Sequence, residues 1–383
     1  MKNMKLNSVY ITVVILSVLF LFAGNRLVRG EFEVFEYLEE VAYYTGVVTE
    51  IVAQNDLPGW GGEERGGTET IFNVRITRGE RRGEIVTAQQ EILYFFTMND
   101  REVSVGDNVV LFYQAWNGIY NFARYVRINY IIVLGIVFLG LVLLFGRKKG
   151  FNAIVALGFT CMAIFWVFIP AILAGRNIYI TAIIVCVYAI VSTLLLVIGA
   201  NKKSLSAMLG CLGGVFLAGL IMLVMDVLLQ LTGVLDRDVA FLLHLGVPVD
   251  LRAIVFAGVI LGAVGAIMDV AMSISSSLWE LKETGGVSSF AGIFKSGITI
   301  GKDILGTMLN TLILAYLGSS LSLILLISAP PQPVPIMLFN EELVIVEFLR
   351  ALVGSFGMLL AIPLTAAICG KLYTLDDNKN DTF

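Results

Sequence analysis

The stretch that decides the fold is INYIIVLGIVFLGLVLLFG, residues 128–146, which contains no charged residue. A helix needs about 20 apolar residues to cross the hydrocarbon core of a bilayer, so this stretch is long enough for one crossing. Seven other stretches are also long and predominantly apolar. The sequence therefore predicts eight transmembrane helices, near residues 7–24, 128–146, 151–174, 178–199, 204–231, 253–275, 304–328 and 344–372.

The composition agrees with this prediction over the whole chain. The 383 residues are 57% hydrophobic and 15% charged, whereas an ordinary soluble domain is about 25% charged. One globular core cannot hide so much apolar surface, because a core of this size still needs a polar exterior. The apolar excess must face lipid, which excludes a soluble enzyme and predicts an α-helical multi-pass membrane protein.

Basic residues set the expected orientation, because short loops rich in Lys and Arg stay in the cytoplasm. Arg147 to Lys149 follow the second span, Lys202 and Lys203 follow the fourth, and every lysine of the chain falls on the same side. With eight spans, both termini are expected in the cytoplasm. The first span lacks the small residues of a cleavage site, so we expect an uncleaved signal-anchor.

Residues 26–127 differ from the rest of the chain. They hold 16 of the 30 acidic residues. Short runs of alternating apolar and polar residues recur there between Gly-rich and Pro-rich turns. Five or six short strands predict a small extracytoplasmic β domain inserted between helices 1 and 2. A barrel, for example of OB type, and a sandwich both fit the pattern.

The chain therefore divides into four expected parts. An N-terminal signal-anchor helix covers residues 1–25, and the extracytoplasmic β domain covers residues 26–127. A seven-helix membrane domain follows at residues 128–375, and a cytoplasmic tail covers residues 376–383. All four cysteines fall within predicted spans, where we expect them to pack as small apolar side chains.

Ionisable residues inside a span are costly, so each is a candidate for function. Asp226 lies toward the outer end of the fifth span, and Asp269 lies toward the cytoplasmic end of the sixth. Their opposite depths exclude a paired aspartate site. Ser273 follows Asp269 at i+4, and the glycines before Asp269 let another helix approach closely. Asp269 then either packs at a helix interface or belongs to a polar ion or solute site.

The seventh span carries polar residues at spacings of three and four, which share one helical face. Asp303 alone is explained by capping or by the helix dipole. Asn310 lies farther into the hydrocarbon and needs a partner, which we expect on the sixth span. The substrate or ion pathway predicted from both spans comprises Asp269, Ser273, Asp303, Thr307, Asn310 and Thr311.

Glu347 and Arg350 are three residues apart near the outer end of the eighth span. We expect an intramembrane ion pair, with a gate or substrate contact as the alternative. The chain has no P-loop, HExxH, CxxC or GxSxG motif. We therefore expect a protein that is not an enzyme and has no catalytic residues, no cofactor and no metal site. The absence of a basic, aromatic-rich surface also argues against nucleic acid as a partner.

Three stretches resemble the YibE/F family of bacterial multispan membrane proteins. They are GAVGAIMDVAMS at 262–273, GKDILGTMLNTLILAY at 301–316, and the region from Glu347 to Thr365. The resemblance covers about residues 125–375, and the added outer domain makes the chain look like the longer, YibE-type member. It implies a bacterial cytoplasmic membrane location and no particular activity. Lys302 departs from the family pattern, and we give it no role.

Two functions remain open from the sequence. One is permease-like transport of a small solute or ion through a polar site between helices 6 and 7. The other is a non-catalytic membrane scaffold or sensor whose outer β domain binds an envelope partner. The expected partners are the lipid bilayer, a small solute or ion and, as a further candidate, a second membrane protein of the same family.

Overall fold

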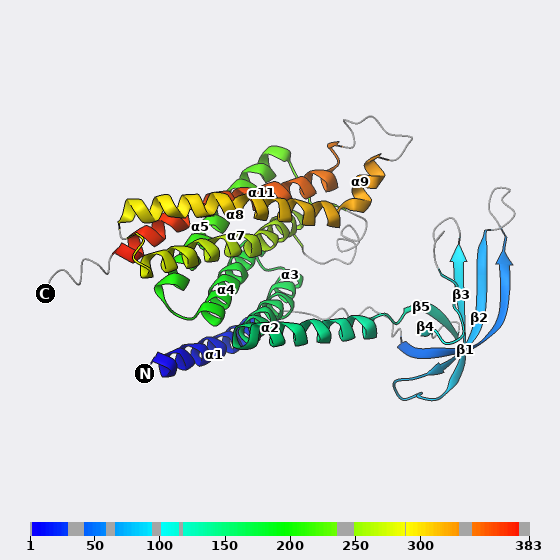
Figure 1. Cartoon of the computed structure of the whole chain (residues 1–383). Helices are drawn as coiled ribbons and strands as arrows, with labels where there is room; N and C mark the ends of the chain where they lie inside the picture. The colour runs from blue at the N-terminus through cyan, green and yellow to red at the C-terminus, as the bar shows by residue number, and fades with distance from the viewer. Residues whose placement is uncertain are drawn as a thin grey trace. The chain divides into compact units, whose positions relative to one another are not determined.

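The computed structural model describes residues 2–29, 42–58, 66–93, 101–114, 118–235, 249–287, 289–328 and 339–374. The tail expected at 376–383 lies outside them. The chain divides into two compact units (Figure 1). One unit combines Met1–Phe32 with Leu143–Phe383, and the other is Glu33–Val142.

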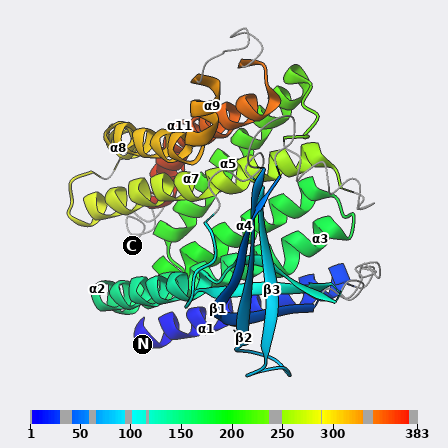
Figure 2. The ribbon, with the colours of Figure 1, turned by 90° about the vertical axis from the view of Figure 1, so that its right-hand side faces the viewer.

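Helices account for most of the described residues, and several of them run side by side (Figures 1 and 2). They are α1 (Lys2–Arg29), α2 (Ile128–Ala163), α3 (Ile169–Leu173), α4 (Ile178–Ile198), α5 (Lys202–Leu229), α7 (Leu251–Glu283), α8 (Phe290–Ser319), α9 (Leu321–Ser328) and α11 (Glu342–Thr374). A π-helical turn, Ile164–Phe168, joins α2 to α3.

Among the described residues, seven helical segments are long and apolar enough to cross a membrane, where eight were expected. The expected second and third spans fall in one segment, Ile128–Leu173, of 46 residues. An unbroken helix of that length would extend about 70 Å, more than twice the thickness of the hydrocarbon core. Inside α2, Arg147 leaves helical geometry with φ 47° and ψ −127°. This break is where the segment can divide into two crossings.

Local sequence signals begin four of the helices. Asn177, Asn201, Asp250 and Ser289 are the N-caps of α4, α5, α7 and α8, and each side chain accepts a hydrogen bond from a backbone N–H. At α5 the cap is reciprocal, because the Ser204 hydroxyl also accepts a bond from the backbone N–H of Asn201. These short polar side chains satisfy N–H groups that have no partner within a helix.

Glycines let α5, α7 and α11 approach one another closely. A β carbon on Gly210 of α5 would lie 2.0 Å from the Thr365 hydroxyl oxygen of α11. On Gly214 it would lie 2.8 Å from both Ala361 Cβ of α11 and Ile267 Cγ2 of α7. Because lipid gives helices no hydrophobic drive to associate, such close packing is a main source of their attraction. α7 lies at the centre and is the most buried of the candidate spans.

Three buried hydroxyl groups join α5, α7 and α11 where α5 begins and the other two helices end. Ser206 Oγ lies 2.7 Å from Ser275 Oγ and 2.9 Å from the Tyr373 hydroxyl, and Ser275 Oγ lies 2.8 Å from the same hydroxyl. Lys282 of α7 also donates to the backbone carbonyl of Tyr373. We call Ser206, Ser275 and Tyr373 the hydroxyl cluster. It holds three helices together at this end of the bundle.

The unit Glu33–Val142 contains a closed five-stranded barrel, which confirms a barrel rather than a sandwich. Its strands are β1 (Ala42–Leu57), β2 (Gly67–Ile76), β3 (Ile85–Leu93), β4 (Asn108–Gln114) and β5 (Ile119–Tyr125). The order around the barrel is β1-β2-β3-β5-β4, with β3 and β5 parallel and the other neighbours antiparallel. This is the strand order of an OB barrel.

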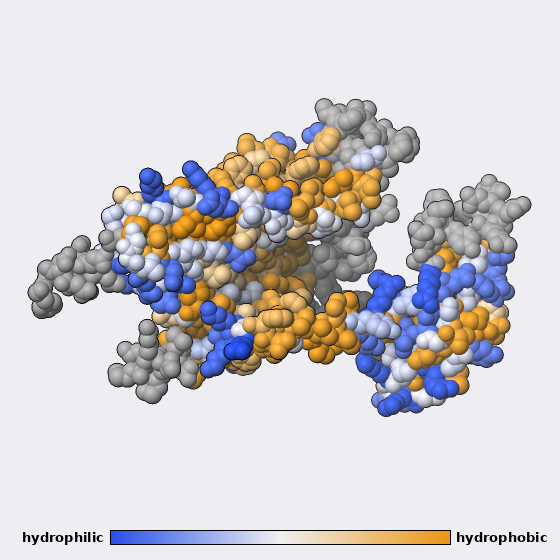
Figure 3. All heavy atoms as spheres, viewed as in Figure 1, coloured by the Kyte–Doolittle hydropathy of each residue, from blue (hydrophilic) through white to orange (hydrophobic). Residues whose placement is uncertain are grey.

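The alternating pattern of the strands fills the barrel interior. Its most buried side chains include Val48, Phe72, Val74, Val109 and Leu111. Arg81 Nη1 donates to the Tyr120 hydroxyl at 2.5 Å. Burial raises the pKa of Tyr120 above its usual value, and the nearby Arg81 guanidinium opposes part of that rise. Hydrophilic residues gather over the barrel surface, whereas hydrophobic residues cover much of the visible helical surface (Figure 3).

Candidate functional site

Along its central part α7 is exposed on only one narrow face. From Gly258 to Asp269, the exposed residues are Gly258, Gly262, Gly265 and Asp269. Their spacings of four, three and four place them on one side of the helix. We call these four residues the α7 strip. Because glycine has no side chain beyond a hydrogen atom, the helix backbone itself is exposed at three of these four positions.

Polar atoms from two other helices lie over the first half of the α7 strip. A β carbon on Gly262 would lie 3.2 Å from the Tyr316 hydroxyl of α8, and one on Gly258 would lie 4.0 Å from Arg350 Nη2 of α11. At Gly265 no atom lies within 4 Å of such a carbon. The Tyr316 hydroxyl and Arg350 Nη2 therefore lie next to the strip, with no side chain of the strip between them and the helix backbone.

Asp269 ends the strip. In the part of the chain that the structure describes, its carboxylate has no hydrogen-bond or ion-pair partner. Ser273, one turn further along, is half-buried. A charged carboxylate in a span needs water, a cation or a hydrogen-bond donor to offset the cost of leaving water. Asp269 can receive that only from outside the described chain.

Two contacts give the register of α7 against α8. Gly262 lies against Tyr316, and a β carbon on Gly297 of α8 would lie 3.1 Å from Leu278 Cδ1 of α7. Residue numbers increase along α7 from the first contact to the second, whereas those of the contacting residues decrease along α8. The two helices are therefore antiparallel. By interpolation, Asp269 is level with the turn of α8 that contains Thr307.

The same register makes Ser273 level with Asp303. The polar residues predicted on α7 and α8 therefore lie at the same height along the two helices. They do not share a face. Asp303, Thr307, Asn310 and Thr311 are exposed on α8, whereas Gly297 and Gly301 of that helix are buried.

The packing of α8 on α11 explains this orientation. A β carbon on Gly301 would lie 2.2 Å from Ile362 Cγ2, and one on Gly297 would lie 2.6 Å from Ala366 Cβ. These contacts turn the opposite, polar face of α8 outward. The contact expected between Asn310 and the sixth span is therefore not made, and Asn310 has no partner among the described residues.

The two threonines of the predicted pathway satisfy their hydroxyl groups locally. Thr307 Oγ1 donates to the backbone carbonyl of Ile304 at 2.9 Å, and Thr311 Oγ1 donates to that of Thr307 at 2.9 Å. Such bonds within one helix are ordinary for hydroxyl residues in a span. Their presence gives no sign of a bound ligand.

A polar cluster lies near the opposite end of the strip. Arg350 Nη1 donates to Glu347 Oε1 at 2.7 Å, and the Ser320 hydroxyl donates to Glu347 Oε2 at 2.9 Å. Both charged side chains are half-buried. Arg350 Nε is buried without a partner in the described chain. The guanidinium therefore depends on Glu347 for its charge compensation while Nη2 lies nearest the strip.

Replacing Glu347 with glutamine should destabilise the helical unit, because Arg350 would keep a half-buried charge without a counter-ion. We expect a loss of about 1–2 kcal/mol, below that of a fully buried pair because water reaches both groups. The midpoint temperature of thermal unfolding in detergent should fall by several degrees. The double variant Glu347→Gln/Arg350→Met should recover part of this loss, because it removes the uncompensated charge. If the double variant is as unstable as the single one, Glu347 and Arg350 do not stabilise the unit as an ion pair.

Asp226 belongs to a different interaction. It accepts a hydrogen bond from Arg252 Nη2 at 2.9 Å, which joins the end of α5 to the beginning of α7. The sequence analysis missed Arg252 as this partner, although both residues lie at the same end of neighbouring spans. It also missed Tyr316, since this residue continues the apolar face of α8 and gives no polar signal. No group of three His, Cys, Asp or Glu residues within the described ranges could hold a metal ion.

Comparison with known proteins gives one match. A family model described as YibE/F-like protein matches residues 134–375, more than half of the chain. The matched region contains the whole α7 strip, Tyr316 and the Glu347–Arg350 pair. The curated proteins and the solved structures gave no match.

Proposed function

Because the chain belongs to the YibE/F-like family and has several apolar helices of membrane-spanning length, we propose that it is a permease-like protein of the bacterial cytoplasmic membrane. A small solute or ion passes along the α7 strip. The observation that carries this proposal is Asp269, a carboxylate without a partner in the described chain, at the end of a row of exposed glycines.

The energetics of a charge in a membrane support a functional role for Asp269. An ionised carboxylate within a span is costly unless a partner or water compensates its charge. A structural carboxylate would offset this cost with a fixed partner, as Asp226 does with Arg252. An unpaired carboxylate instead suits a water-filled path and a cation or proton that binds transiently. We therefore favour a cationic or protonatable species at this position.

The polar groups along the strip form a series between its two ends. Arg350 lies beside Gly258, the Tyr316 hydroxyl lies beside Gly262, and Asp269 ends the series. Gly258 and Asp269 are about 16 Å apart along the helix axis, roughly half of the hydrocarbon thickness. Such a series can replace part of the hydration shell of a small polar solute over the central part of the membrane.

The basic residues support an orientation for this path. Arg147 to Lys149, Lys202 and Lys203 occupy short connections, and such residues remain in the cytoplasm. With one crossing on each side of the break at Arg147, the seven segments make eight spans and keep both termini in the cytoplasm. The barrel is then extracytoplasmic, Asp269 is near the cytoplasmic side, and Glu347 with Arg350 is near the outer side.

The proposal requires water in the α7 strip, and cysteine labelling tests this directly. Gly265→Cys should react with a membrane-impermeant maleimide, since a β carbon there meets no neighbouring atom. The background should carry Cys161→Ser, because Cys161 is exposed while Cys186, Cys211 and Cys369 are buried.

The matched control is Phe216→Cys, which lies midway along α5 on an exposed apolar face. This residue should face lipid and stay unlabelled in intact membranes. Labelling of the control and the strip at equal rates, or no labelling at residue 265, would contradict a water-accessible path.

A scaffold or sensor is the second candidate, and the outward polar face of α8 favours it. Asp303 and Asn310 are exposed without partners in the described chain, and polar groups on a span promote association with another helix. The partner would be a second membrane protein of the same family, or an envelope component held by the barrel. Measuring ion or solute flux through purified full-length protein in proteoliposomes distinguishes a permease from a scaffold, because a scaffold supports no flux.

A further inference from the structure

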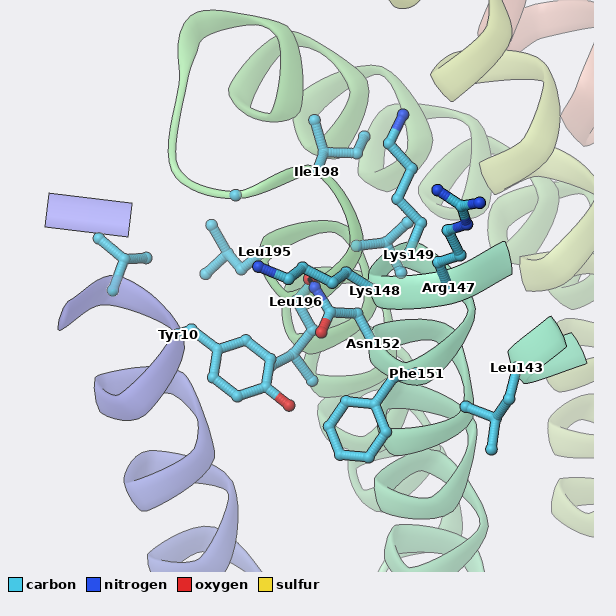
Figure 4. Close-up of a pocket in the computed structure, with 13 residues that line it drawn as sticks. Tyr10, Leu143, Arg147, Lys148, Lys149, Phe151, Asn152, Leu195, Leu196 and Ile198 are labelled. Atoms are coloured by element: carbon cyan, nitrogen blue, oxygen red, sulfur yellow. Dashed lines mark hydrogen bonds between the residues drawn. The ribbon is translucent and has the colours of Figure 1, made fainter. Parts of the chain in front are cut away.

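A cavity of about 990 Å³ lies among α1, the second part of α2 and α4, away from the α7 strip (Figure 4). Its apolar wall includes Val9, Leu143, Phe151 and Leu195. Its volume is that of a site for a sizeable organic ligand, for which the usual range is about 300–1,000 Å³. Such an apolar wall suits an apolar part of a ligand.

Three consecutive basic residues, Arg147, Lys148 and Lys149, also line the cavity. No acidic residue is among the described residues that line it, and none of the three has an ion-pair partner in the described chain. In Figure 4, Lys148 extends across the cavity toward Leu195, while Arg147 and Lys149 extend from the same end of the helix. The cavity therefore has one apolar part and one strongly cationic part.

The basic run coincides with the backbone break in α2. Arg147 has a φ of 47°, which residues with a side chain rarely adopt. Since the helix breaks at Arg147, the basic run lies at a helix boundary that lines the cavity. Lys148 crosses the cavity toward Leu195, whereas Arg147 and Lys149 extend in other directions from this boundary (Figure 4).

Two other polar residues line the cavity. Asn152 Nδ2 donates to the backbone carbonyl of Leu196 at 3.0 Å, which fixes α2 against α4 beneath the basic run. Tyr10 of α1 contributes a ring to the wall and a hydroxyl group without a partner among the described residues. This hydroxyl is available to donate to a ligand oxygen.

We propose that the cavity binds an anionic glycerophospholipid. The phosphodiester group accepts a hydrogen bond from Lys148, the positive charges of Arg147 and Lys149 attract the anion, and an acyl chain packs on Val9, Leu143 and Leu195. Basic pockets between spans on the cytoplasmic side suit such headgroups, because the anion compensates the clustered cations and the chain covers the apolar wall. A free phosphate ion would satisfy the cations but would leave the wall exposed.

Lipid binding to the purified full-length protein in detergent tests this proposal. Phosphatidylglycerol should bind and raise the temperature of unfolding, whereas phosphatidylcholine, which has the same chains and no net charge, should not. The variant Lys148→Gln/Lys149→Gln should weaken phosphatidylglycerol binding about thirtyfold, from the loss of two basic contacts. Arg147→Gly should also weaken it while keeping the fold, because glycine accepts the φ of this position.

The matched control is Lys295→Gln/Lys302→Gln, which removes the same charge from exposed positions of α8. It should bind phosphatidylglycerol as the unmodified protein does, and an equal loss in this control would overturn the proposal in favour of general surface charge. Equal binding of phosphatidylcholine would also overturn it. Inorganic phosphate or glycerol phosphate binding as tightly as the lipid would show a free-anion site and overturn the lipid as the ligand.

Discussion

Gly210→Val is expected to abolish accumulation of folded protein, because α5 and α11 leave no room for a side chain at this position. A β carbon would lie 2.0 Å from Thr365 Oγ1 and 3.0 Å from Thr365 Cα, so backbone as well as side chain would have to move. The hydroxyl cluster holds the same helices together nearby. Overpacking a core costs about 1–3 kcal/mol even where neighbours adjust, and here they cannot.

Size-exclusion chromatography of a fluorescent fusion in mild detergent would measure this effect as loss of the monodisperse peak. The control is Gly158→Val, which makes the same change on an exposed part of α2 where a β carbon meets no atom within 4 Å. This variant should retain the peak. A normal peak for Gly210→Val would show that α5 and α11 do not pack as closely as described.

Asp269→Asn should reduce flux about tenfold or more while leaving the amount of folded protein unchanged. The substitution keeps the size of the side chain and removes the charge that attracts a cation, and a hydrogen bond to a charged group contributes about 1.5–3 kcal/mol. Cation and proton flux should be measured in proteoliposomes with ion-sensitive dyes inside the vesicles. Asp269→Glu should retain part of the flux, because it keeps the carboxylate.

Two other outcomes of Asp269→Asn would contradict a transport role for this residue. If Asp269→Asn loses folded protein instead of flux, Asp269 is a packing residue that donates or accepts at a helix interface. If it keeps both folded protein and full flux, the α7 strip is not the path. The measurement of folded protein beside the flux therefore separates the structural role from the transport role.

Elements with a local signal could be predicted from the sequence. The apolar runs predicted the helices, and the alternation between Tyr44 and Ile128 predicted a small β domain, because both patterns depend on neighbouring residues alone. The choice of a barrel over a sandwich depends on the parallel pairing of β3 with β5, which joins Ala88 to Tyr120. A pairing across so many residues leaves no trace in a local pattern.

The arrangement of the candidate site also depends on contacts between distant residues, which local patterns do not predict. Helical spacing put Asp303, Thr307 and Asn310 on one face of α8, but could not say which face packs. That choice follows from Gly301 meeting Ile362 on a distant helix. The glycines before Asp269 suggested a packed ridge, and the structure packs them unevenly: the Tyr316 hydroxyl lies close to Gly262, whereas Gly265 has no neighbour within 4 Å of a β carbon. Small residues permit close approach, and only the position of the neighbouring helices decides whether it occurs.

The hydroxyl cluster has a mechanical consequence for the bundle. Since it bonds α5, α7 and α11 to one another, these helices behave as a fixed frame. Within residues 290–319, the described polar side chains of α8 make hydrogen bonds only to their own helix. Its C-terminal cap, Ser320, is tethered to Glu347. Apolar contacts, such as that of Gly301 on Ile362 of α11, therefore hold the rest of α8 against this frame.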